Sequence, residues 1–195
     1  MTQAQRIVFV DVVIHSIDPL DFDVFPSEKN DPELPTGPDG IIFENDGYDG
    51  FKIYFELKGE TFGYFFPPHQ RKHDAVWSQL GTVCPRSQVW DVFQPLQVVE
   101  PNPPPGHPVE RRTLIVRNKN PGPKPGQGQF QYNLRVTNGA DWKDLDPGGT
   151  NNNGRTSAFD WSYIAVGVGT GVVSSVLTLL AVARTDLICS GQPGF

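Results

Sequence analysis

The sequence predicts a mainly β protein, an antiparallel β-sandwich with Pro- and Gly-rich loops, followed by a single C-terminal transmembrane helix. Three observations support this. Short runs of alternating apolar and polar residues recur along the chain. The 195 residues include 20 Gly and 19 Pro, which favour turns over long helices. One long stretch near the C-terminus carries no charge.

Seven runs before residue 140 have the composition or alternation of strands, and strong turn signals separate them. The clearest is in 128–139, where Phe130, Tyr132, Leu134 and Val136 alternate with polar residues. Six to eight short strands at this spacing are typical of a sandwich. The expected strands are 6–15, 40–45, 50–59, 60–68, 87–100, 111–120 and 128–139.

The remaining segments complete a four-part organisation. Before residue 160 the only helical candidate is 69–80, and the Asp- and Asn-rich segment 141–154 is expected to be a loop. We expect a β-sandwich domain over 1–150, a linker over 151–160, a transmembrane helix over 161–184 and a short tail over 185–195.

The segment QFQYNLRVTNGADWKDLDP, residues 129–147, resembles the closing part of small bacterial Ig-like β-sandwich domains. In those domains an alternating strand ends in Gly, and an aromatic residue and Leu-Asp-Pro follow. The resemblance covers about 20 residues and implies an Ig-like sandwich without implying an activity.

The predicted membrane helix rests on 21 uncharged residues, Tyr163–Ala183. At 1.5 Å per residue they would extend about 32 Å, close to the thickness of a hydrocarbon core. The alternative is two buried strands, 163–169 and 172–183. The expected membrane-interface anchors are Trp161, Tyr163 and Arg184, and the expected helix-packing row is Gly167, Gly171 and Ser175.

The expected topology is single-pass. The N-terminus shows no clear export signal, so the β domain is expected to be cytoplasmic and the C-terminal tail to lie on the opposite side. Cys84 and Cys189 flank the apolar stretch and would then be on different sides of the membrane. Their redox state therefore tests the topology.

Charge and motif patterns argue against several classes of function. The net charge is −6, with 13 acidic and four basic residues in 1–60, which disfavours nucleic-acid binding. His69 and His73 have metal-ligand spacing, but no third ligand is near in sequence. We expect both to be surface residues.

Two acidic segments are also candidate cation sites. The segment 45–56 places Asn45, Asp49, Gly50 and Glu56 at positions 1, 5, 6 and 12 of a calcium loop, yet it reads better as a Gly-rich hairpin turn. Asp144 and Asp146, with three Asn residues after them, could coordinate a hard cation but fit a turn-forming loop better. We expect neither a metal nor another cofactor.

These observations predict a non-catalytic accessory or structural subunit of a larger membrane complex. An energy-converting or photosynthetic reaction centre–antenna assembly is an example. Its partners would be other subunits, contacted through the helix and the β domain, and the lipid bilayer. The alternative is a soluble binding module for carbohydrate or protein, whose tail forms core strands and whose candidate contacts are Trp77, Trp90 and Trp142. A metal-dependent enzyme using His69 and His73 is a third possibility.

Overall fold

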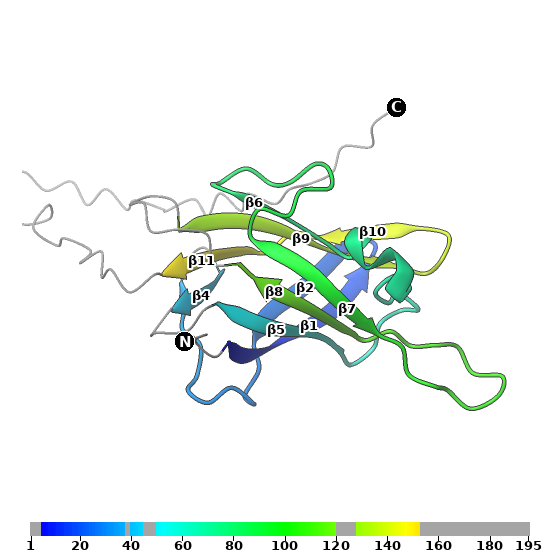
Figure 1. Ribbon diagram of the computed structural model, residues 1–195. Coiled ribbons are helices and arrows are strands. Elements are labelled where there is room, and N and C mark those ends of the chain that lie inside the picture. Colours follow the sequence, from blue (N-terminus) through cyan, green and yellow to red (C-terminus); the bar gives the residue numbers. More distant parts are fainter. Residues whose placement is uncertain (1–4, 38–39, 45–49, 120–127, 153–195) are drawn as a thin grey trace, which may run out of the picture. The chain divides into compact units, whose positions relative to one another are not determined.

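The computed structural model describes residues 5–37, 40–44, 50–119 and 128–152. The chain divides into Met1–Arg155 and Thr156–Phe195, and all described residues belong to the first unit. This unit is mainly β and is built from two sheets (Figure 1).

The first sheet has five strands in the order β2-β1-β5-β8-β7. The second has the order β10-β9-β11-β4-β3, and β6 pairs with the other side of β9. A 3-10 helix, η1, covers His69–Asp74. The strands are β1 (Arg6–Ile17), β2 (Leu20–Pro26), β3 (Thr36–Gly37), β4 (Gly40–Glu44), β5 (Phe51–Lys58), β6 (Val76–Leu80), β7 (Phe93–Val99), β8 (Thr113–Asn118), β9 (Gln129–Thr137), β10 (Trp142–Leu145) and β11 (Gly148–Asn152).

Alternation in the sequence decides which side chains face the core. In β1, β5 and β9 every second residue is buried, because successive side chains of a strand point to opposite faces. The inward residues of the two sheets meet in one hydrophobic cluster. The inward residues of these three strands are Val8, Val10, Val12, Ile14, Phe51, Ile53, Phe55, Leu57, Phe130, Tyr132, Leu134 and Val136.

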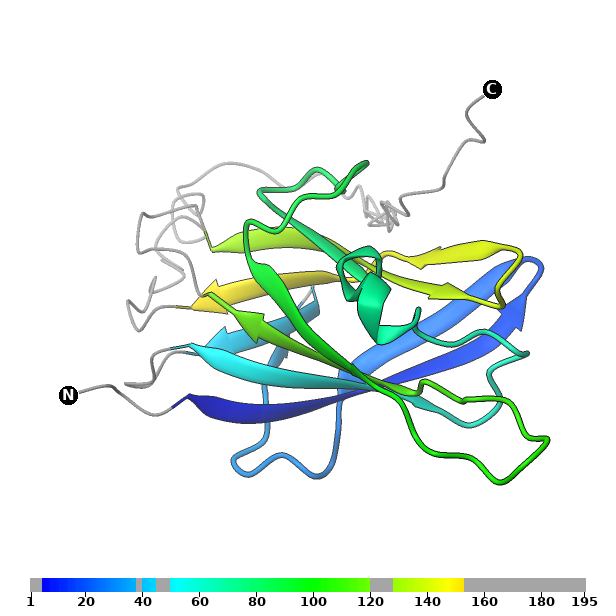
Figure 2. The same ribbon diagram turned by 45° about the vertical axis from the view of Figure 1, so that its right-hand side comes forward.

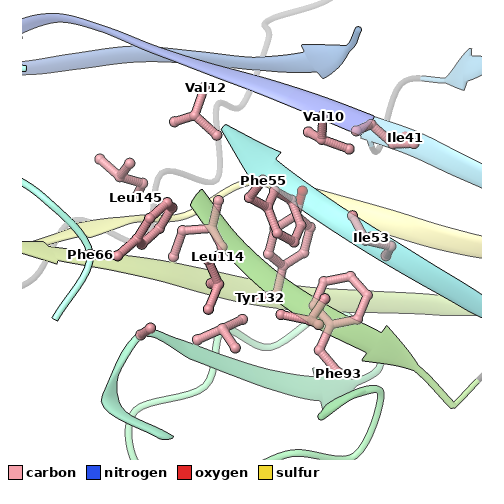
Figure 3. Packing of buried hydrophobic residues seen from close by; sticks show 14 of the residues in the cluster. Val10, Val12, Ile41, Ile53, Phe55, Phe66, Phe93, Leu114, Tyr132 and Leu145 are labelled. Carbon is pink, nitrogen blue, oxygen red and sulfur yellow. The ribbon is translucent and has the colours of Figure 1, made fainter. Parts of the chain in front are cut away.

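Aromatic rings join the two sheets at the centre of this cluster. The Phe93 ring of β7 lies 5.1 Å from that of Phe130 and 5.0 Å from that of Tyr132, both on β9. Phe55 of β5 lies 6.0 Å from Phe93, and Figure 3 shows Phe55, Phe93 and Tyr132 in the same space between the sheets. Burial raises the pKa of the Tyr132 hydroxyl well above its usual range. The sheets are therefore held together by closely packed rings.

The pairing differs from a wholly antiparallel sandwich in two places. β1 runs parallel to β5, and β11 runs parallel to β4. Between β2 and β5 the chain passes into the second sheet to form β3 and β4, and it then returns to the first sheet. Because β5 enters from the other sheet, no tight hairpin fixes its direction relative to β1. The wholly antiparallel expectation is wrong.

Three local expectations also need correction. The segment 141–154, expected as a loop, contains β10 and β11, which pair with the long strand β9. In the helical candidate 69–80, only His69–Asp74 is helical and the rest is β6. The expected strand 60–68 contributes a single bridge, Phe65 to Thr137. In each case pairing with a distant partner decided the structure.

Candidate binding surface

The outer face of the second sheet carries a group of tryptophan, arginine, asparagine and aspartate side chains. On β9, Gln131, Asn133, Arg135 and Thr137 alternate with the residues of the hydrophobic core and so point away from it. Asn133 and Thr137 are themselves buried on this outer face. Trp77 of β6 pairs with Asn133, while Asp144 and Trp142 of β10 pair with Arg135 and Thr137. Directly opposed residues of antiparallel strands share a face. Three neighbouring strands thus place aromatic, cationic and acidic groups together.

Two arginines and two tryptophans on this face form a continuous arrangement, which we call the Trp–Arg stack (Trp77, Arg135, Trp142 and Arg71). The Arg135 guanidinium lies 4.0 Å from the ring centroid of Trp77 and 4.7 Å from that of Trp142. The Arg71 guanidinium, from η1, lies 5.0 Å from the Trp142 centroid. These distances are within the range of favourable cation–π interaction.

Carboxylates fix both guanidinium groups of the stack. Arg135 Nε donates to Asp144 Oδ1 at 2.6 Å, and Arg71 Nε donates to Asp74 Oδ2 at 2.8 Å. Gln88 Nε2 donates to the other oxygen of Asp74 at 2.6 Å. The stack is therefore built before any partner binds, and its side chains have little rotamer freedom left to lose on association.

The described tryptophans lie outside the hydrophobic core. Trp77, Trp90 and Trp142 are all partly exposed, although tryptophans of a sandwich more often belong to the core. Trp90 sits beside β6, where its Nε1 donates to Val76 O at 2.9 Å and its ring contacts that of His73 at 5.2 Å. The structure thus places all three sequence-predicted contact residues on or beside the second sheet and outside the core.

Three buried polar atoms lie in one cross-strand row on the same face, which we call the polar row (Trp77, Asn133 and Asp146). Within the described part of the chain, Trp77 Nε1, Asn133 Oδ1 and Asp146 Oδ1 have no hydrogen-bond partner. Asn133 Nδ2 donates to Pro85 O at 3.1 Å, which ties the connection between β6 and β7 to the sheet (Figures 1 and 2). Burial first, and the Asp144 carboxylate second, raise the pKa of Asp146 to about 7.

The histidine pair is not arranged as a metal centre. His69 Nδ1 accepts from Val98 N at 3.3 Å, whereas His73 packs on Trp90. No group of three His, Cys, Asp or Glu side chains among the described residues could hold a metal ion.

The calcium-loop positions Asn45 and Asp49 lie outside the described residues. Gly50 precedes β5, and β4 and β5 belong to different sheets, so this segment does not connect the two strands of a hairpin. Glu56 Oε2 accepts from Lys29 and Lys58 on the outer face of the first sheet. Burial alone would raise the pKa of Glu56, but the two ammonium groups outweigh it and leave the pKa lowered.

Cys84 is disulfide-bonded. The only other cysteine in the sequence, Cys189, lies outside the described residues. A bond between these two residues would require both to be on one side of a membrane, so its chemical detection would contradict the single-pass topology.

The predicted anchors Trp161, Tyr163 and Arg184 lie outside the described residues, as does the predicted packing row Gly167, Gly171 and Ser175. Within the ranges that the structure describes, no helix is long and apolar enough to cross a bilayer.

Comparison with known proteins gives no relative for this chain: no protein-family model, curated protein or solved structure matches it.

Sequence reasoning identified the tryptophans but missed Arg71, Arg135 and Asn133. The signal for two of them was present, because Arg135 and Asn133 are on the polar side of the clearest alternating strand. What the sequence could not give was the register that sets them beside Trp77, which is more than 50 residues away along the chain.

Proposed function

We propose that this chain is a non-catalytic accessory subunit whose β-sandwich binds another protein through the Trp–Arg stack. The position of the tryptophans outside the core is the observation that carries this proposal. Trp, Tyr and Arg are enriched at the energetically important centres of protein interfaces. Trp77 and Trp142 share a guanidinium between them, which gives the surface a rigid centre of aromatic rings and arginine.

The chemistry of the stack favours a protein over a sugar as its ligand. Two guanidinium groups already lie over the Trp142 ring, which leaves less free aromatic face for a sugar to cover. The flanking carboxylates Asp74 and Asp144 are paired with the arginines and surround the rings with polar groups. Aromatic and arginine side chains at the centre, with polar groups around them, are the usual composition of a protein–protein interface.

We propose further that residues 161–184 anchor the subunit to a membrane as one helix, with the β domain cytoplasmic and the tail on the opposite side. The support is the uncharged stretch Tyr163–Ala183. Under this proposal the complex is an energy-converting or comparable membrane assembly, and Gly167, Gly171 and Ser175 contact its other helices. The Ig-like resemblance of residues 129–147 belongs with this proposal as a finer description of the sandwich.

Co-purification tests the binding surface. Trp142→Ala should lower the amount of partner recovered with the full chain in mild detergent by about tenfold or more, as expected for a central interface tryptophan. Lys52→Ala is a matched control, because Lys52 lies 5.3 Å from the Tyr54 ring on the other sheet. Equal recovery with both variants, at unchanged thermal stability, would show that the stack is not the docking surface.

Membrane fractionation with a carbonate wash tests the anchor. The full chain should remain in the pellet, and a chain truncated after Trp161 should be soluble and folded. If the full chain is soluble, or if truncation unfolds the protein, residues 161–184 are not a membrane anchor.

The second candidate is a soluble β-sandwich module that binds carbohydrate or protein, with residues 163–183 as core strands. The disulfide at Cys84 favours it, because stable disulfides are characteristic of oxidising compartments rather than the cytoplasm. Peptide mapping by mass spectrometry without reduction separates the candidates. A Cys84–Cys189 cross-link within one chain supports the soluble module, and a cross-link from Cys84 to a cysteine of another chain supports the membrane-anchored subunit.

A further inference from the structure

Asn133 of β9 lies opposite Asp146, which is at the junction between β10 and β11 in the second sheet. Leu134 pairs with Leu145, and Gln131 pairs with Gly148, so the same register places Asn133 opposite Asp146. The intervening bond, from Tyr132 N to Pro147 O at 3.3 Å, confirms the alignment. Side chains come closest at the non-hydrogen-bonded positions of an antiparallel pair, which is where Asn133 and Asp146 lie.

The next non-hydrogen-bonded pair along these strands shows that side chains at such positions can bond to each other. Arg135 and Asp144 occupy the following non-hydrogen-bonded position, and their side chains are bonded at 2.6 Å. That pair joins a donor to an acceptor. In contrast, Asn133 Oδ1 and the Asp146 carboxylate are both acceptors, and neither oxygen has a partner among the described residues.

The Asn133 amide cannot resolve this conflict by turning over. Its Nδ2 donates to Pro85 O at 3.1 Å, so a flipped amide would lose that bond and set its oxygen against a carbonyl. The indole N–H of Trp77, in the same row, donates to neither oxygen. Asn133 is only 5% exposed, and a buried acceptor without a donor is unfavourable.

We propose that Asp146 is protonated in the folded protein and that its hydroxyl donates a hydrogen bond to Asn133 Oδ1. The proton completes a chain of hydrogen bonds from the β10–β11 junction through β9 to Pro85. This chain acts as a latch that holds the connection 81–91 against the outer face of the second sheet. The proposal is independent of the proposed function and concerns how this face is controlled.

The charged groups around Asp146 agree with a bound proton. Asp144 is on the same face two residues away, and the nearest opposed cation, Arg135, is directed to Asp144. From η1, Arg71 and Asp74 are bonded to each other, and β6 presents no ionisable side chain. The connection 81–91 adds the exposed Arg86 and Asp91. Burial and Asp144 together raise the pKa of Asp146 to about 7.

The latch is therefore expected to respond to pH near neutrality. Because the folded state binds this proton more tightly than the unfolded state does, its contribution to stability is greatest at low pH and is lost as the pH rises through about 7. Above that pH a carboxylate would face the Asn133 oxygen and weaken the attachment of Pro85. The segment 82–87, on which Cys84 lies, would then open more often.

Other attachments confine the effect to the tip of the connection. At its two ends, Gly81 N donates to Gln129 O at 2.9 Å and Asp91 N donates to Ser78 O at 2.9 Å. Ser78 Oγ accepts from Phe93 N at 2.7 Å. None of these bonds involves a titrating proton. Residues 82–87 should respond to pH while the flanking strands do not.

Hydrogen exchange and carbon-13 NMR on the full chain test the proposal. In the wild type, after correction for intrinsic rates, amides of 82–87 should exchange at least about fivefold faster at pH 8.5 than at pH 6. Asp146→Asn supplies an amide donor at every pH, so it should keep exchange slow at both. Asp21→Asn, an exposed substitution of equal charge change on β2, should behave as the wild type.

The Asp146 carboxyl resonance provides an independent readout. We expect its titration midpoint near pH 7, and Asn133→Ala should lower that midpoint by removing the acceptor of the neutral form. A midpoint near 4 in the wild type would overturn the proposal. So would a midpoint that Asn133→Ala leaves unchanged, or the same pH dependence of exchange in Asp146→Asn and the wild type. The wild-type titration decides the matter even if a variant fails to fold.

Discussion

Arg135 should contribute more to stability than its position on the outer face of a sheet suggests. Its side chain is only 17% exposed and contacts the rings of Trp77 and Trp142 at 4.0 and 4.7 Å. A desolvated cation–π contact contributes about 1 kcal/mol or more, so the two together give about 2 kcal/mol. The ion pair with Asp144, which is 42% exposed, adds about 0.5 kcal/mol.

Arg135→Gln should therefore lower the free energy of unfolding by about 2–3 kcal/mol. Arg135→Lys keeps the charge but loses the planar group that stacks on both rings, and should lower it by about half as much. The assay is urea unfolding of the full chain in mild detergent, followed by far-ultraviolet circular dichroism. Tryptophan fluorescence reports the change around the rings.

A double-mutant cycle separates the cation–π contribution from general damage. Combining Arg135→Gln with Trp142→Leu should give a coupling energy of about 1 kcal/mol, because the two side chains are in contact. Strict additivity, or a loss below about 0.5 kcal/mol for Arg135→Gln alone, would mean that the stack does not stabilise this face.

Two further predictions concern the fold. Phe93→Ala removes the ring that joins the sheets and should lower the free energy of unfolding by about 4 kcal/mol. Phe25→Ala, at a site 41% exposed, should change it by less than about 0.5 kcal/mol. Similar values for both variants in urea titrations would contradict the described core. Gly50→Ala should be more destabilising than Gly81→Ala by about 1 kcal/mol or more in the same titrations, because both have positive φ but only at Gly50 would a Cβ lie 2.7 Å from Asn118 O. Equal effects would show that this close approach is relieved.

The strands that alternation marks clearly were predictable from the sequence. β1, β5 and β9 follow their apolar pattern nearly residue for residue, because one face of each is buried. β10 carries only one buried residue, Leu145, and β11 begins with two glycines, so neither has a pattern of its own. Both strands owe their pairing to β9, which is a tertiary effect that local sequence does not encode.

The candidate site was predictable in composition but not in geometry. The sequence pointed to the tryptophans and to Asp146, and alternation put Asn133 and Arg135 on a polar face. Their proximity depends on the register of β6 and β10 against β9. A slip of one residue would move every one of these side chains to the opposite face, so register had to come from the structure.

The central place of β9 also constrains how the protein can be made. β9 bonds with β6 on one side and with β10 and β11 on the other, and β4, near residue 40, is joined to the sheet through β11. A ribosome releases residues 36–44 long before residues 129–152 exist to receive them. The second sheet therefore cannot assemble until residues 129–152 have been synthesised. The nascent segments of β4 and β6 remain unpaired with β11 and β9 until these strands have been synthesised. Unpaired strands expose apolar surface, so we expect the nascent chain to bind chaperones.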